Sequence, residues 1–182
     1  MKIKVTKRVG TKKSELSQIR HKGDVPAVLY GKESHLISLD GAEFHAVMRT
    51  MKTGHLPTTV FELEGDGVKC RAIVKDIQYH PVTYNVLHLD LLEVDGKPVK
   101  VNVPVECLGE ADCVGIKLGG ALRQVIRHVK ALCEPQNIPT SFQLNIAQMA
   151  IKQSKRVGDI KVPEGVTILA GLKDVVVTIA KR

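Results

Sequence analysis

The side chains best suited to chemistry lie close together in the chain: Lys75, Gln78, His80, His88 and Asp90. Alternate residues of a strand share a face, so we expect His88 and Asp90 on one face of one strand, with Lys75 and Gln78 near the end of its neighbour. Three uses remain open. His80, His88 and Asp90 are enough ligands for a zinc or acid–base site. His88 and Asp90 can instead form a structural hydrogen bond. The whole set also offers donors and acceptors for RNA bases and sugars.

Other signs of catalysis are missing from the sequence. No Asp or Glu occupies an obvious general-base position, and neither the phosphate-loop pattern G-K-S/T nor the nucleophile pattern G-x-S-x-G occurs. The cysteines form no C-x-x-C pair and have no histidine at zinc-finger spacing; they are Cys70, Cys107, Cys113 and Cys133. We therefore expect a protein that is not an enzyme and that uses no metal, cofactor or small-molecule substrate.

The first 32 residues hold nearly all the net charge of the chain. They contain nine basic side chains against two acidic ones, Glu15 and Asp24, whereas the net charge of the whole chain is +8. A charge imbalance this local directs a segment toward a polyanion, most commonly a nucleic acid. The basic residues are Lys2, Lys4, Lys7, Arg8, Lys12, Lys13, Arg20, Lys22 and Lys32.

Composition narrows the class of protein further. Aromatic residues make up 3% of the chain and there is no Trp, which argues against the base-stacking platforms of RRM and OB domains. No apolar run approaches the roughly 20 residues of a membrane span. The N-terminus lacks the apolar core of a signal peptide. We expect a cytoplasmic protein without membrane contact.

Strand patterns dominate the sequence. Two turns rich in glycine, Gly65-Asp66-Gly67 and Asp95-Gly96, each separate two strand-like runs and each predict a hairpin. Residues 121–132 are ambiguous, because their apolar spacing is helical while their Val and Ile content favours a strand. The other expected strands are 3–9, 27–30, 35–39, 58–64, 68–78, 86–94, 98–108, 140–146, 166–169 and 174–180.

Two short helices are expected in the first half. Asp40 is a candidate N-cap, with Glu43 completing a capping box and Gly54 ending the run. Its apolar stripe is interpreted as core packing. A shorter helix is expected from an N-cap at Ser14 to a stop at Gly23, and it leaves four basic residues largely in solvent: Lys12, Lys13, Arg20 and Lys22.

The chain is long enough for two domains, with a boundary near Glu93 to Asp95. The expected domains are 1–93 and 94–182.

The chain resembles, over essentially its full length, the bacterial large-subunit ribosomal protein that binds 5S ribosomal RNA. The first-half motifs are Arg20-x-x-Gly23-x-Val25-Pro-Ala-Val-Leu-Tyr-Gly31, Lys75-Asp-Ile-Gln-Tyr-His-Pro81 and His88-Leu-Asp90. The second half resembles the C-terminal β domain of the long form, the general stress protein CTC type. Its motifs are Val103-Pro-Val105, Gly115-Ile-Lys-Leu-Gly-Gly120, Asn137-Ile-Pro139 and Val162-Pro-Glu-Gly-Val166.

The resemblance implies a mainly β fold: a closed N-terminal β-barrel with two short helices, then a C-terminal β-rich domain. It favours strand for residues 122–133. It implies a structural constituent of the large ribosomal subunit that binds 5S rRNA and helps to anchor it in the central protuberance, beside neighbouring ribosomal proteins and rRNA. What the C-terminal domain contacts stays open. The alternative is a stress-related RNA or protein interaction module acting off the ribosome.

The resemblance also implies which residues face the RNA. Arg8, Lys13 and Arg20 are expected on phosphates, while other residues fix the register through hydrogen bonds to sugars and bases. The full expected set is Arg8, Lys12, Lys13, Arg20, Tyr30, Lys75, Gln78, His88 and Asp90.

The chain departs from the family pattern at two places. Family members often carry a Gly-Lys-Gly-like loop and extra arginines where this chain has Thr11-Lys-Lys-Ser-Glu-Leu-Ser-Gln18. Glu15 and Gln18 are expected to weaken the electrostatic attraction, with Lys12 and Lys13 compensating. Leu91 stands where an aromatic residue is usual, and we interpret it as a core substitution.

Overall fold

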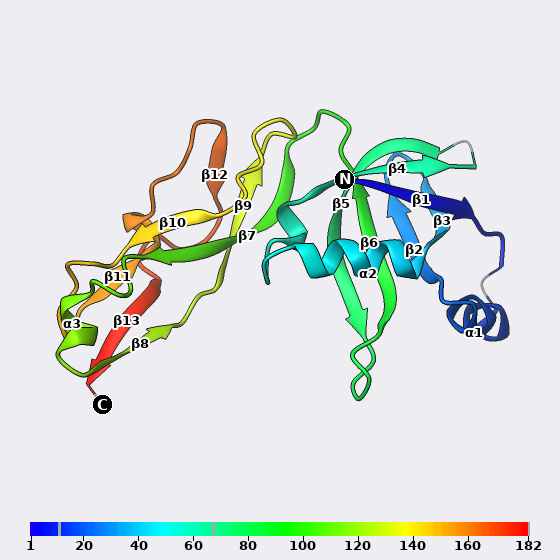
Figure 1. The fold of residues 1–182 in the computed structure, drawn as a ribbon. Coiled ribbons are helices and arrows are strands. Elements are labelled where there is room, and N and C mark those ends of the chain that lie inside the picture. The colour runs from blue at the N-terminus through cyan, green and yellow to red at the C-terminus, as the bar shows by residue number, and fades with distance from the viewer. Residues whose placement is uncertain (11, 67, 182) are drawn as a thin grey trace. The chain divides into compact units, whose positions relative to one another are not determined.

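A computed structural model describes residues 1–10, 12–66 and 68–181. The chain divides into two units, Met1–Lys97 and Pro98–Arg182. Each unit is built mainly from strands (Figure 1), which confirms the predicted fold class. Among the described residues, no helix is long and apolar enough to cross a membrane.

The first unit is a closed barrel whose strands follow the order β1-β3-β2-β6-β5-β4. Parallel pairing of β1 with β4 closes it. Its interior is filled by alternate strand residues, such as Leu29, Leu63 and Leu89. Leu91 is also buried, which confirms it as a core residue. The strands are β1 (Lys2–Lys7), β2 (Val25–Tyr30), β3 (Ser34–Leu39), β4 (Val60–Gly65), β5 (Val68–Tyr79) and β6 (Val86–Glu93).

One of the two predicted hairpins forms and the other does not. Strands β4 and β5 pair antiparallel around the first turn, in which Gly67 lies outside the described residues. Strand β6 belongs to the barrel, whereas β7 (Val99–Leu108) belongs to a sheet of the second unit, so the hairpin predicted at Asp95-Gly96 is wrong. A turn dipeptide sets only local backbone geometry. The apolar faces of β6 and β7 pack into separate cores, and this decides their partners.

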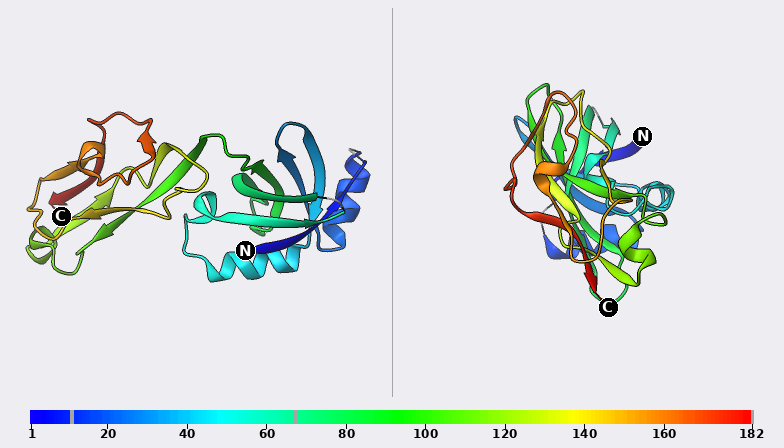
Figure 2. Two further views of the ribbon diagram at one scale, coloured as in Figure 1. Left: turned by 90° about the horizontal axis from the view of Figure 1, so that it is seen from above. Right: turned by 90° about the vertical axis from the view of Figure 1, so that its left-hand side faces the viewer.

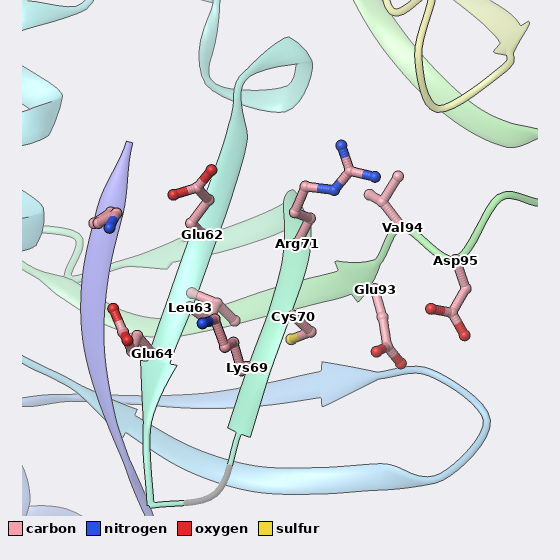
Figure 3. A pocket seen from close by; sticks show the side chains of 10 residues that line it. Glu62, Leu63, Glu64, Lys69, Cys70, Arg71, Glu93, Val94 and Asp95 are labelled. Carbon is pink, nitrogen blue, oxygen red and sulfur yellow. The ribbon is translucent and has the colours of Figure 1, made fainter.

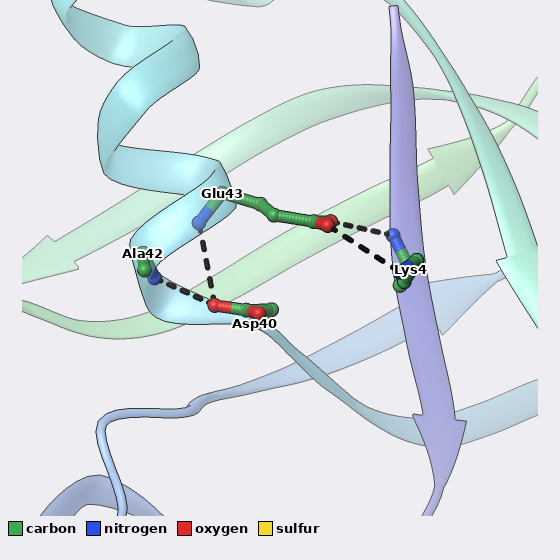
Figure 4. Close-up of polar contacts among 4 residues, drawn as sticks. All are labelled: Lys4, Asp40, Ala42 and Glu43. Atoms are coloured by element: carbon green, nitrogen blue, oxygen red, sulfur yellow. Dashed lines mark hydrogen bonds and ion pairs between the residues drawn. The ribbon is translucent and has the colours of Figure 1, made fainter.

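Helix α2 (Gly41–Thr50) lies along the barrel beside β1 (Figure 2). The Asp40 carboxylate caps it by accepting hydrogen bonds from the N–H groups of Ala42 and Glu43 at 2.8 and 3.3 Å. The predicted capping box is wrong, because the Glu43 carboxylate accepts a hydrogen bond from the backbone N–H of Lys4 at 3.2 Å instead (Figure 4). Phe44 is buried, as the core interpretation requires. The helix ends before Gly54, and a single 3-10 turn, η1 (Leu56–Thr58), follows.

Helix α1 (Lys13–His21) begins two residues earlier than predicted. Lys12, not Ser14, occupies the N-cap, and its carbonyl oxygen accepts hydrogen bonds from the N–H groups of Glu15 and Leu16. Gly23 follows the helix with a φ of 92°, a conformation that glycine adopts without strain, and stops it as predicted. The helix is exposed along one side, so its predicted basic residues do lie in solvent: Lys12, Lys13, Arg20 and Lys22.

The second unit consists of two sheets, β10-β7-β9-β12 and β11-β13-β8. Residues 122–133, predicted as one strand, belong to two: β8 and β9 are separated at residues 125–127 and pair with different partners, β13 and β7. The break at residues 125–127 shifts the alternation and explains the helix-like spacing. The elements are α3 (Val114–Lys117), β8 (Gly120–Gln124), β9 (His128–Cys133), β10 (Phe142–Asn145), β11 (Ser154–Arg156), η2 (Val157–Asp159), β12 (Val166–Ile168) and β13 (Val175–Lys181).

Candidate nucleic-acid interface

Strand register gathers polar residues on the outer side of β2, β6 and β5. His88 lies opposite Gln78, and Asp90 lies opposite Asp76 on one side and in register with Val28 on the other. The intervening residues of β6 point into the barrel and are buried. The sheet therefore holds these side chains at fixed spacing on the outside of a rigid core.

His88 and Asp90 share one face, as the alternation predicted. His88 Nδ1 lies 3.1 Å from Asp90 Oδ1, and the two side chains are 18% and 26% exposed. This contact lacks the alignment of a good hydrogen bond, since Nδ1 is buried without an aligned partner. Burial lowers the pKa of His88; Asp90 opposes this, while the positive charges of Arg8 and Arg20 lower the pKa further. The imidazole is therefore neutral at neutral pH.

Arg8 is held by backbone carbonyl groups. Its Nε donates to the carbonyl oxygen of Ile37 at 3.1 Å, and its Nη1 donates to that of Gly10 at 3.0 Å. Partial burial, together with the nearby charge of Arg20, lowers the pKa of Arg8, although a guanidinium stays charged under all ordinary conditions. Within the part of the chain that the structure describes, these two hydrogen bonds use two of its five N–H donors, so Arg8 is both a structural and a charged group.

Arg20 connects α1 to the barrel. Its Nε donates to the carbonyl oxygen of Leu87 at 3.1 Å, one residue before His88 on β6. The rest of this side chain is exposed. The structure thus brings Arg8, Arg20, His88 and Asp90 together, although they come from three separate segments of the chain. We call this group, with Gln78, the polar face.

The remaining predicted residues lie around the polar face. Lys12 and Lys13 are exposed at the start of α1. Tyr30 is 39% exposed and in register with Leu92. This places it about 13 Å along the sheet from the level of His88, at 3.3 Å per residue. Lys75 is exposed where a bulge interrupts the pairing of β5 with β6.

The bulge also exposes Asp76, a residue that the sequence interpretation missed. Asp76 Oδ1 accepts a hydrogen bond from the N–H of Ile77 at 2.9 Å, and its strand position faces Asp90. Carboxylates opposite each other on neighbouring strands repel. In the sequence, the consecutive charged residues Lys75 and Asp76 interrupt the alternation of the strand, but this pair does not by itself indicate a bulge.

Glu15 does not reach freely into solvent. Its carboxylate is partly buried and lies against Gly10, where it fills the space that a Cβ of residue 10 would need. Gly10 therefore accommodates Glu15 in the segment that links β1 to α1. Gln18, the other departure from the family pattern, is exposed.

His80 is separate from the His88 and Asp90 pair. Its Nδ1 accepts hydrogen bonds from the N–H groups of Val82 and Thr83, which uses the ring to shape the β5–β6 turn. No three His, Cys, Asp or Glu side chains converge as metal ligands anywhere in 1–10, 12–66 and 68–181. The structure does not assemble the metal or acid–base site considered above.

A second charged surface on the barrel has a different character. On the outer side of β1, β4 and β5, Lys2, Glu62 and Arg71 form one row across the strands. Lys4, Glu64 and Lys69 form the next, and we call these six residues the alternating face. A hollow of about 420 Å³ lies beside it (Figure 3), where burial and the carboxylates of Glu93 and Asp95 raise the pKa of Cys70. Each row places a carboxylate between two cations.

The fold defines a β-barrel protein with a second β unit, and the polar face holds two arginines on the outside of the barrel. Residues 3–91 match the model of the ribosomal L25p family, and residues 98–182 match that of the C-terminal domain of ribosomal protein TL5. The chain belongs to the ribosomal L25p family, in the long form that carries the TL5-type domain. The resemblance that the sequence motifs gave is confirmed.

Full-length relatives agree with this assignment. The chain is 44% identical to the large ribosomal subunit protein bL25 of Chlamydia trachomatis serovar L2 and 42% identical to that of Chlamydia pneumoniae, with all of both chains covered in each case. The bL25 protein of Chlamydia abortus is 40% identical over the same extent. These proteins are named as ribosomal proteins, and the chain is a structural ribosomal protein of this family, not an enzyme.

Proposed function

We propose that the chain is a structural constituent of the large ribosomal subunit that binds 5S rRNA through the polar face and helps to anchor this RNA in the central protuberance. The observation that carries the proposal is the meeting of Arg8 and Arg20 with the His88 and Asp90 pair on a rigid sheet. The basic segment of residues 1–32 supplies the attraction, and the relatives named above are large-subunit proteins.

The basic residues provide the sequence-independent part of binding. Arg20, Lys12 and Lys13 are exposed and suited to contact phosphates, and each contact releases condensed counterions. Arg8 directs its remaining donors from a position fixed by two carbonyl groups. Because those carbonyls are neutral, they orient the guanidinium without cancelling its charge.

The sheet residues provide the register. A neutral imidazole is both a donor and an acceptor, and the carboxylate of Asp90 accepts hydrogen bonds from base amino groups and ribose 2′-hydroxyls. Gln78 adds amide donors and an acceptor opposite His88. The wide minor groove of an A-form helix displays these groups to a flat protein surface.

Direct binding to purified 5S rRNA tests the proposal, with a scrambled RNA of equal length as the control and a salt titration for each. We expect tight, selective binding whose affinity falls steeply with salt. Equal or absent binding to both RNAs would contradict it. Co-sedimentation with large subunits at moderate salt checks the location, because a factor that acts off the ribosome stays in the supernatant.

A further inference from the structure

The turn between β5 and β6 is tightly organised around one histidine. Backbone hydrogen bonds join the N–H of His80 to the carbonyl oxygen of Asn85 at 2.8 Å and the N–H of Tyr84 to the carbonyl oxygen of His80 at 2.9 Å. The imidazole Nδ1 accepts two more, from Val82 and Thr83. Figure 1 shows this hairpin reaching beyond the body of the barrel. Residues 79–85, which we call the hairpin tip, are therefore an ordered projection.

The hairpin tip nevertheless exposes large apolar side chains. Val82 is 77% exposed, Tyr84 76% and Tyr79 45%. The three phenylalanines of the chain, in contrast, are fully buried. Aromatic rings that lie largely in water add little to the stability of the fold. A group of exposed apolar side chains on an ordered loop instead marks a contact surface.

Tyr84 also has an unfavourable backbone conformation. Its φ is 56°, in the left-handed region where a glycine or an asparagine is normally found. A tyrosine does not favour this backbone conformation, and the exposed ring of Tyr84 contributes little packing to the fold. Strain of this kind at an exposed position points to a use of the side chain outside the folded chain.

The surroundings of the hairpin tip favour RNA as its partner. The pair of Gln78 and His88, which belongs to the polar face, comes just before the tip on the same two strands. The segment from Ile77 to Leu89 contains no Asp, Glu, Lys or Arg, so no carboxylate repels phosphates there. RNA bound on the polar face therefore runs close to the tyrosine rings, and unpaired bases are commonly bound by stacking on such rings.

We propose that the hairpin tip extends the RNA interface beyond the barrel, with the ring of Tyr84 stacking on an unpaired nucleobase. This inference rests on the proposed function. It adds a contact that is independent of charge to a surface otherwise governed by arginines and lysines. His80 acts as a positioning residue, since it holds the loop that carries the ring.

Affinity for 5S rRNA as a function of salt tests the stacking contact. Tyr84→Ala should weaken binding by about 5- to 150-fold, the range for loss of one stacked base, and leave the salt slope unchanged. Tyr84→Phe keeps the ring and should bind like the wild type, and Thr83→Ala is the matched control from the same loop. Unchanged affinity of Tyr84→Ala would overturn the proposal while the proposed function stands.

Two further results separate the alternatives. If the wild type itself fails to select 5S rRNA, the proposed function and the stacking contact both fail. If Tyr84→Ala binds free 5S rRNA normally but is lost from large subunits, the tip contacts a protein and the proposal is wrong.

Replacement of His80 tests the positioning role. His80→Asn places an amide oxygen near the position of Nδ1 and should preserve the two hydrogen bonds from the backbone, as in an Asx turn. His80→Ala removes the acceptor. We expect His80→Ala to weaken RNA binding several-fold and His80→Asn to restore it, with both variants folded by circular dichroism. Equal affinity of the two variants would contradict the role assigned to His80.

Discussion

The polar face and the alternating face lie on the same barrel but use their cations differently. On the alternating face, Glu62 lies between Lys2 and Arg71 on neighbouring strands, so charges of opposite sign offset one another. On the polar face, the hydrogen bonds that hold Arg8 and Arg20 run to backbone carbonyl oxygens. A carbonyl orients a guanidinium and leaves its full charge available. The way in which a cation is held therefore distinguishes a binding surface from a self-neutralised one.

The largest effect is expected at Arg8. Arg8→Ala removes two charge-assisted hydrogen bonds and leaves the carbonyl oxygens of Ile37 and Gly10 without these donors, at a cost of about 2 kcal/mol in the free energy of unfolding. RNA affinity should fall as well. Urea denaturation and a binding titration measure the two effects. The matched change on the alternating face, Lys69→Ala, should leave both quantities nearly unchanged, and an equal loss there would break the comparison.

Asp90 tests the register contacts of the polar face. Asp90→Asn should lower affinity for 5S rRNA by about tenfold, the value of roughly one charge-assisted hydrogen bond, with little change in the salt slope. Glu62→Gln is the control from the alternating face and should bind normally. A loss of folding in Asp90→Asn, seen as a lower melting temperature, would instead assign Asp90 to a structural pair with His88.

The lowered pKa of His88 has a consequence for stability. A histidine whose pKa is depressed in the folded state binds more protons when unfolded, so its contribution to stability is present above the ordinary value of 6.5 and is lost as pH falls from there toward the folded pKa. Acidification over this window should destabilise the wild type more than His88→Gln. Thermal unfolding of both proteins from pH 7.5 to pH 5 measures the difference, and parallel curves would show that His88 titrates normally.

The smallest effect is expected at Glu15, whose carboxylate lies against Gly10 beside the basic segment. Glu15→Gln removes a negative charge that repels RNA phosphates. It should raise affinity for 5S rRNA about twofold at low salt, the effect of one charge about 10 Å from a phosphate in water. Glu64→Gln, on the alternating face, should have no such effect. A decrease in affinity for Glu15→Gln would mean that its carboxylate orders the link to α1.

Patterns within single strands predicted much of the fold. Period-two alternation predicted the shared face of His88 and Asp90 on β6, and the comparison with the family pattern predicted Leu91 as a core residue. The basic segment indicated a polyanion. The resemblance to ribosomal proteins supplied the closure of the barrel, which no local pattern specifies.

Features that depend on partners distant in sequence were missed. The Glu43 carboxylate does not complete a capping box, because it accepts a hydrogen bond from the backbone N–H of Lys4 on β1. The dipeptide Asp95-Gly96 is typical of a turn, but the strands before and after it, β6 and β7, belong to different sheets and do not pair. Neither the bulge that exposes Asp76 nor the role of His80 in the hairpin tip can be derived from spacing, because each is decided by hydrogen bonds across strands or within a folded loop.

The most direct test compares Arg20→Ala with Arg71→Ala in a salt titration of binding to 5S rRNA. Both residues are exposed arginines of the same barrel, one on the polar face and one on the alternating face. Arg20→Ala should weaken binding and lower the slope of log affinity against log salt by about one, whereas Arg71→Ala should change neither. Equal changes for the two variants would show that total charge, and not the way each arginine is held, determines RNA binding.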